Sequence, residues 1–203
     1  MTGLALGRTG AYVAVMTEFS ALDQRDGLPD ALRVLLAEYP RDIWQSHRNF
    51  DGLTRFWLER HLMFRQALDR LRSEAEAALD GRMDPDRYRQ NTARLAGFFL
   101  NQLHGHHMIE DHHYFPQLSA LEVPLARGFE ILDADHHMLD GHIQGLADQT
   151  NAMLRAETAG FTTATGTLHG ALAGFEGFLD RHLVDEEELV VPVILKHGSS
   201  LEG

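Results

Sequence analysis

Two stretches of the chain, 76 positions apart (106 to 182 and 110 to 186), carry the same motif near the end of a helical pattern. His106 is followed four residues later by Glu110, and His182 is followed four residues later by Glu186. Residues four apart lie on one face of a helix, so each motif presents an imidazole and a carboxylate together. The repeat therefore predicts two copies of one helical unit, which excludes most irregular folds.

The hydrophobic pattern predicts long helices and no sheet. Apolar residues recur at spacings of three and four, as in amphipathic helices, and no run alternates with the period of two that a strand requires. Pro116 is expected to end the second helix and Pro192 to interrupt the end of the fourth. The first three predicted helices cover residues from about 50 to 79, 84 to 114 and 123 to 156. The fourth follows the break at 159–160, with Thr162 and Thr163 as possible caps, and continues to about residue 190.

Short links between these helices favour an all-α fold, an antiparallel up-down-up-down four-helix bundle with a short N-terminal helix. Residues 47–197 are expected to form the bundle, and residues 29–46 a short helix and a connector. Residues 1–28 lack a sustained period and are expected to be a flexible segment, and residues 198–203 form a tail.

The first and third helices each add one histidine, and these two are 75 positions apart (61 to 136). At a rise of about 1.5 Å per residue, counting from the turns puts the histidines of each hairpin within roughly 3–5 Å of one level. All four can therefore face one another inside the bundle. The predicted metal ligands are His61, His106, Glu110, His136, His182 and Glu186.

The composition supports a metal site of this kind. The chain has 13 histidines, and histidine is the commonest metal-ligating side chain. Four imidazoles and two carboxylates suit iron, manganese or zinc and are poor ligands for copper(I). Buried carboxylates are costly without a cation, so the ion is expected to be an integral part of the fold.

Charge and residue usage exclude other classes. The absence of cysteine rules out disulfides, thiolate catalysis and iron–sulfur clusters. A net charge of −12 counts against nucleic acid as a partner, because phosphate binding needs surplus Lys and Arg. No segment reaches the roughly 18 apolar residues of a membrane span, so no membrane association is expected and the predicted location is cytoplasmic.

The ordered pattern His, His-x-x-x-Glu, His, His-x-x-x-Glu resembles the hemerythrin-like, or HHE cation-binding, family of four-helix non-haem di-iron proteins. The resemblance covers about residues 47–197 and rests on the segments RHLMFR, HHMIEDHHYFP, DADHHML and DRHLVDEEELVVP. It implies two oxo- or hydroxo-bridged iron ions, with zinc or manganese as possible substitutes. It also implies a small diatomic or peroxide partner, with O2, peroxide or nitric oxide bound or reduced at the site.

Two positions depart from the pattern of the oxygen carriers. Asp140 stands where those proteins place a second histidine, and its counterpart on the first helix is Arg65. A missing imidazole leaves a coordination position open to solvent, substrate or Asp140 itself, and an open position favours reactivity over reversible carriage. Arg65 and Asp140 are expected to approach each other near the site. Glu187 competes with Glu186 as the last ligand, and the repeat favours Glu186.

Other polar residues are expected around the ligands or in solvent. Asp135 precedes a predicted ligand and can hold an imidazole in position, and His113 projects almost with His106, seven residues before it. Only Glu186, with Glu187 as the other possibility, is expected to turn inward from the acidic run 185–188. The remaining histidines of the helices are expected to face solvent: His104, His107, His112, His137 and His142.

The sequence is compatible with more than one function. A ferritin-like site needs two Glu-x-x-His motifs, but Glu110-x-x-His113 has no equivalent in the second half of the chain. An iron-binding or iron-donating module without turnover, or a structural zinc site, would use the same ligands. The sequence leaves open whether the protein is an enzyme and which oligomeric state it has.

Overall fold

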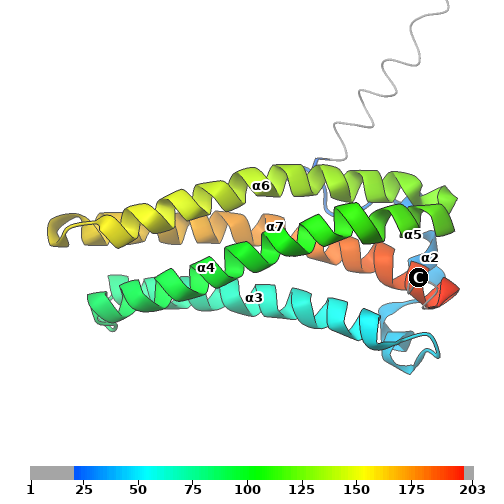
Figure 1. Ribbon diagram of the computed structural model, residues 1–203, viewed down its shortest axis with the longest axis horizontal. Coiled ribbons are helices and arrows are strands. Elements are labelled where there is room, and N and C mark those ends of the chain that lie inside the picture. The colour runs from blue at the N-terminus through cyan, green and yellow to red at the C-terminus, as the bar shows by residue number, and fades with distance from the viewer. Residues whose placement is uncertain (1–20, 199–203) are drawn as a thin grey trace, which may run out of the picture.

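The computed structural model describes residues 21–198, and this part of the chain contains helices and no strands. The all-α prediction is therefore confirmed. Four long helices lie side by side along the long axis, and successive ones run in opposite directions (Figure 1). Within this set, α3 and α6 each pack against both α4 and α7. The four are α3 (Gly52–Leu79), α4 (Pro85–Ile109), α6 (Ala126–Arg155) and α7 (Phe161–His197).

The first two long helices begin at aspartate caps. The Asp51 carboxylate accepts a hydrogen bond from the backbone N–H of Thr54, and the Asp84 carboxylate accepts one from Arg87. Such caps satisfy N–H groups that have no partner within the helix. Pro85, directly after its cap, has a φ angle already suited to the first turn.

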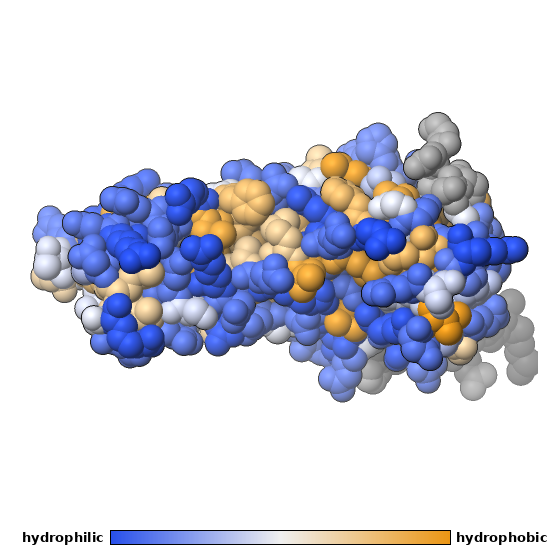
Figure 2. Space-filling model, turned by 90° about the horizontal axis from the view of Figure 1, so that it is seen from below, coloured by the Kyte–Doolittle hydropathy of each residue, from blue (hydrophilic) through white to orange (hydrophobic). Residues whose placement is uncertain are grey.

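The surface is largely hydrophilic, but apolar side chains gather over the middle of the face on the side of α3 (Figure 2). Several large apolar side chains on α3 and α4 are exposed, among them Phe56, Leu62, Phe98, Met108 and Ile109. None of the described helices has both the length and the apolar character needed to cross a membrane.

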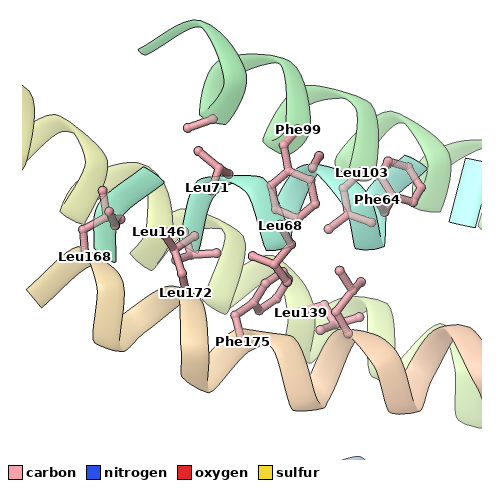
Figure 3. Close-up of a cluster of buried hydrophobic side chains, with 14 of the residues drawn as sticks. Phe64, Leu68, Leu71, Phe99, Leu103, Leu139, Leu146, Leu168, Leu172 and Phe175 are labelled. Carbon is pink, nitrogen blue, oxygen red and sulfur yellow. The ribbon is translucent and has the colours of Figure 1, made fainter. Parts of the chain in front are cut away.

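The interior contains two large apolar clusters, one toward each end of the long helices. The first is built around residues such as Phe64, Leu68, Phe99 and Phe175 (Figure 3). The second includes Trp57 and packs the ends of α6 and α7 against the shorter helices. The predicted ligands lie where the two clusters meet along the long helices, so a polar layer lies between two largely apolar regions.

The second long helix does not end at Pro116, contrary to the prediction. It passes into a π-helical turn, η3 (Glu110–Tyr114), and continues as α5 (Phe115–Leu121). A π turn shifts the hydrogen bonds from i+4 to i+5 and so changes their register. Pro116 then falls in the first turn of α5, where its missing N–H costs little.

Pro192 does not interrupt the end of the fourth helix, since α7 continues through it to His197. A proline inside a helix removes one hydrogen bond. Residues 189–195 are all buried, so apolar packing on both sides of Pro192 offsets that loss.

The N-terminal part of the described chain packs against the long helices. The short helix predicted there is divided into η1 (Asp30–Leu32) and α2 (Val34–Glu38), and η2 (Arg41–Ser46) follows. The expectation of a flexible segment does not hold for residues 21–28, where Leu22, Arg25 and Leu28 are buried. The rest of that predicted segment lies outside the described residues. Residues 21–28 therefore pack against the long helices although their apolar residues have no regular spacing.

Candidate metal centre

The six predicted ligands converge in the polar layer. Helix α3 supplies His61, α4 supplies His106, and α6 supplies His136, while α7 supplies His182 and Glu186. The sixth, Glu110, is the first residue of the π-helical turn. Five of these side chains are at most 2% exposed, and His106 is 10% exposed.

One half of the cluster joins α3 to α4. The Nε2 atoms of His61 and His106 are 3.0 Å apart. Glu110 Oε1 lies 2.9 Å from His106 Nε2, and Glu186 Oε1 lies 3.3 Å from His61 Nε2. These four side chains offer ligand atoms close enough to share one ion.

The other half joins α6 to α7 in the same way. The Nε2 atoms of His136 and His182 are 3.1 Å apart. Glu110 Oε2 lies 3.6 Å from His136 Nε2, and Glu186 Oε2 lies 3.4 Å from His182 Nε2. Each glutamate thus directs one oxygen to each imidazole pair, which is the arrangement of a carboxylate that bridges two ions.

Three of the four imidazoles have a carboxylate on their outer nitrogen. His61 Nδ1 lies 3.1 Å from Glu187, His136 Nδ1 2.6 Å from Asp111, and His182 Nδ1 3.3 Å from Asp135. An ionised carboxylate only accepts hydrogen bonds, so in each neutral ring the proton is on Nδ1. The inner Nε2 atom then carries a lone pair, which fixes the tautomer that binds a metal.

The Nε2 atoms and glutamate oxygens at the centre of the cluster are better suited to bind a cation than to bind one another. When the rings are neutral, the lone pairs on facing Nε2 atoms repel, and both oxygens of the buried Glu110 accept no hydrogen bond. Glu186 Oε2 also accepts none, although Trp57 Nε1 donates to Glu186 Oε1. A buried carboxylate is costly unless a cation or donors compensate it. The donor set therefore fits iron, manganese or zinc.

The pKa values reflect this crowding of like groups. Burial lowers the pKa of His106 to about 3. Burial and the nearby charge of Glu186 raise the pKa of Glu110 well above its usual value. Burial opposes protonation of His182, but the nearby carboxylates of Asp135 and Glu186 favour the charged form more strongly and raise the pKa of His182 to about 9. Protons and a cation therefore compete for the same atoms.

Arginines hold the carboxylates that surround the ligands. Glu187 accepts hydrogen bonds from Arg41 and Arg65, each at 2.8 Å, in addition to His61. Burial opposes ionisation of Glu187, but His61 and Arg65 lower its pKa to about 2. Glu187 thus lies on the outer nitrogen of His61, and Glu186 lies on the inner one.

Arg25 performs the same role on the opposite side. Its guanidinium binds both oxygens of Asp135, and its Nε donates to Asp185 at 2.8 Å. Asp185 also accepts hydrogen bonds from Arg181 and from the backbone N–H of Leu28. Asp185 is fully buried, contrary to the expectation that only Glu186 or Glu187 turns inward from this acidic run, because these donors compensate its charge. No pattern in the sequence singled out Arg25.

The ion pair expected between Arg65 and Asp140 is absent. Arg65 pairs with Asp180 and Glu187, and Asp140 is exposed and lies 3.3 Å from His104. The reason is the packing of the helices, since α3 and α6 each pack against α4 and α7 and lie diagonally opposite. Asp140 therefore does not replace the missing imidazole.

Two histidines were assigned to the wrong environment. Within the described part of the chain, His113 is exposed and makes no hydrogen bond, ion pair or ring contact with the cluster, because the π turn rotates it away from the face of His106. His107 is 2% exposed, stacks on His136 with ring centroids 4.0 Å apart, and has no hydrogen bond on either nitrogen. Because α4 packs against both α3 and α6, two of its faces are buried.

Comparison with known proteins gives one further observation. A family model described as the hemerythrin HHE cation-binding domain matches residues 52–194. Searches of curated proteins and of solved structures found no match. All six residues of the cluster lie within the matched range, whereas Arg25 and Arg41 lie before it.

Proposed function

The chain belongs to the hemerythrin HHE cation-binding family, and from this membership we propose that it binds two iron ions and binds or reduces O2, peroxide or nitric oxide there. The proposal depends on one observation above all. Glu110 and Glu186 each direct one oxygen to each of two imidazole pairs, so the six side chains offer two adjacent positions. An up-down-up-down four-helix bundle is the arrangement that brings them together.

The protein's own residues would hold the ions, shield them and leave room for a ligand. His61 and His106 would bind one ion, His136 and His182 the other, and the two glutamates would bridge them. Two ferrous ions would supply the electrons to reduce a small bound molecule. The apolar clusters on both sides of the layer limit the access of water, which strengthens electrostatic interactions within it.

The position of Asp140 supports an open coordination site. With Asp140 turned toward His104, each ion would have two imidazoles and two carboxylate oxygens from the six residues of the cluster. Non-haem iron sites with few protein ligands keep positions for exogenous molecules. This favours a reactive site over a closed structural one.

The test is metal analysis of the protein from its native host, followed by optical spectra with O2, peroxide and nitric oxide. We expect about two irons per chain and a spectral response to at least one ligand. Zinc in place of iron would indicate a structural site, and iron without any spectral response would indicate an iron-binding or iron-donating module.

A double variant tests the ligand assignment. His106→Ala with His182→Ala removes one imidazole from each pair and should abolish iron binding, while far-ultraviolet circular dichroism stays helical. The matched control is His137→Ala with His112→Ala, which removes two exposed imidazoles. Equal iron content in the two double variants would refute the assignment.

A further inference from the structure

A cavity of about 360 Å³ opens between α3 and α4 and ends at one half of the metal centre. Its inner end is formed by His106 and Glu110, and its walls include Leu53, Phe56, Trp57 and Ile109. Phe56 and Ile109 are 58% and 52% exposed, so the apolar wall continues to the surface. Apolar side chains are visible over the side of α3 in the space-filling view (Figure 2).

The size of this cavity exceeds what a diatomic molecule needs. A water molecule occupies about 30 Å³ in the liquid, so the cavity offers room for roughly ten non-hydrogen atoms. Its volume falls within the range of about 300–1,000 Å³ that is typical of pockets for small organic molecules. A gas channel alone would not require a cavity of these dimensions.

Arg60 gives the cavity a positive group. This half-buried side chain lines the wall, donates to Gln102 Oε1 at 2.6 Å, and lies over the rings of Phe56 and Phe64. No carboxylate pairs with Arg60 among residues 21–198, whereas Arg25, Arg41 and Arg65 all hold carboxylates of the metal centre. A guanidinium fixed at an apolar wall is a good partner for a carboxylate.

We propose that this cavity binds a small organic carboxylate beside the metal centre. The carboxylate pairs with Arg60 and Gln102, and the apolar body lies along Trp57, Phe56 and Ile109 toward His106. A ligand of this class would be the substrate or effector of the centre, and in that respect the inference rests on the proposed function. Binding itself depends only on the cavity and Arg60.

The experiment is calorimetric titration of the metal-loaded protein with hexanoate as the probe. Acetate keeps the charge but lacks the apolar body, and hexan-1-ol keeps the body but lacks the charge. We expect hexanoate to bind at least about tenfold more tightly than either, because each buried CH2 and the charge-assisted pair both contribute. Hexanoate binding no tighter than acetate or hexan-1-ol would overturn the inference.

Three variants locate the site. Arg60→Gln should weaken hexanoate by about tenfold or more and leave hexan-1-ol unchanged, and Ile109→Trp should fill the cavity and weaken both. The matched control is Arg55→Gln, which removes a charge from an exposed position on the same helix. If Arg60→Gln binds hexanoate like the wild type, the inference is wrong.

Metal content, measured on each sample, separates this inference from the proposed function. A wild-type chain that takes up no metal contradicts the proposed function, and hexanoate titration of that metal-free chain still tests the cavity. A chain that holds two irons but fails the hexanoate comparison contradicts the present inference alone.

Discussion

At the scale of single residues, the outer carboxylates decide which nitrogen of each imidazole faces inward. Asp135, Asp111 and Glu187 accept the Nδ1 protons of His182, His136 and His61. Those three acids lie on the outer nitrogens, and they determine where the inner lone pairs point. Such partners commonly change metal affinity by about 10–100-fold when removed.

Asp135→Asn tests this role. The amide has the shape of the carboxylate but lacks its charge, so it holds the Nδ1 proton of His182 less strongly. We expect metal affinity to fall by about tenfold or more, with the helical content unchanged. Competition with a chelator measures the affinity. Asp148→Asn, on the exposed side of the same helix, is the control, and equal affinities in the two variants would contradict the prediction.

At the scale of elements, the segment before α3 contributes to the centre through Arg25 and Arg41. Arg25 is nearly fully buried between Asp135 and Asp185. Burying an acid without a partner is costly, whereas a hydrogen-bonded pair keeps it ionised. The short N-terminal segment is therefore held by charge as well as by the apolar contacts of Leu28, Leu32 and Leu35.

Arg25→Met should lower the free energy of unfolding by about 3–5 kcal/mol, because two buried carboxylates lose a partner. Denaturation with urea measures it, and Arg94→Met, at an exposed position, serves as the control. Adding Asp185→Asn to Arg25→Met should recover part of the loss, since it removes one of the buried charges. Equal free energies of unfolding for Arg25→Met and Arg94→Met would contradict this prediction.

Glu122 lies between α5 and η4 (Val123–Leu125) and forms ion pairs with the end of α7. Lys196 and His197 donate to its carboxylate at 2.6 and 2.9 Å, and these hydrogen bonds lower the pKa of Glu122. A carboxylate with a lowered pKa stabilises the fold above its ordinary pKa. This contribution is lost as the pH falls through the lowered value.

Glu122→Gln should therefore be less stable than the wild type near neutral pH, and the difference should shrink as the pH falls below the ordinary range of glutamate. Urea denaturation from about pH 7 to about pH 3 checks the trend. Glu59→Gln removes the same charge from an exposed site on α3 and should show no such convergence. A gap between Glu122→Gln and the wild type that stays constant with pH would contradict the prediction.

At the scale of the whole molecule, a layer of buried charged groups divides two apolar clusters. Without a cation, the acids and imidazoles of this layer would compensate one another only in part. The ion should therefore stabilise the entire fold, since it binds the folded chain and few of its ligands are near one another in the unfolded chain.

Removal of metal should lower the melting temperature. A free ion concentration of about 100 times the dissociation constant adds about 2.7 kcal/mol per site, so the effect should be measurable by calorimetry with and without a chelator. The double variant of His106 and His182 should melt at the same temperature in both conditions. A wild-type chain unaffected by the chelator and containing no metal would show that the layer is stable by itself.

The long helices and their ligand positions could be predicted from the sequence, because their residues recur at regular helical spacing. The repeat identified residues that lie together, because helices of fixed rise bring His61 and His182 to the two oxygens of Glu186. The environment of His107 could not be predicted, since it depends on which two helices enclose α4. Arg25 could not be found either, because an isolated arginine in an aperiodic segment shows its partners only after folding.

The contacts of Arg25 and Arg41 affect where the functional unit begins. The family match starts at residue 52, and both arginines lie before it. A fragment cut at that boundary would retain every ligand but leave Asp135, Asp185 and Glu187 with fewer cationic partners. Expression of the matched range alone would thus yield an incomplete centre, and the smallest cooperative unit extends back at least to residue 25.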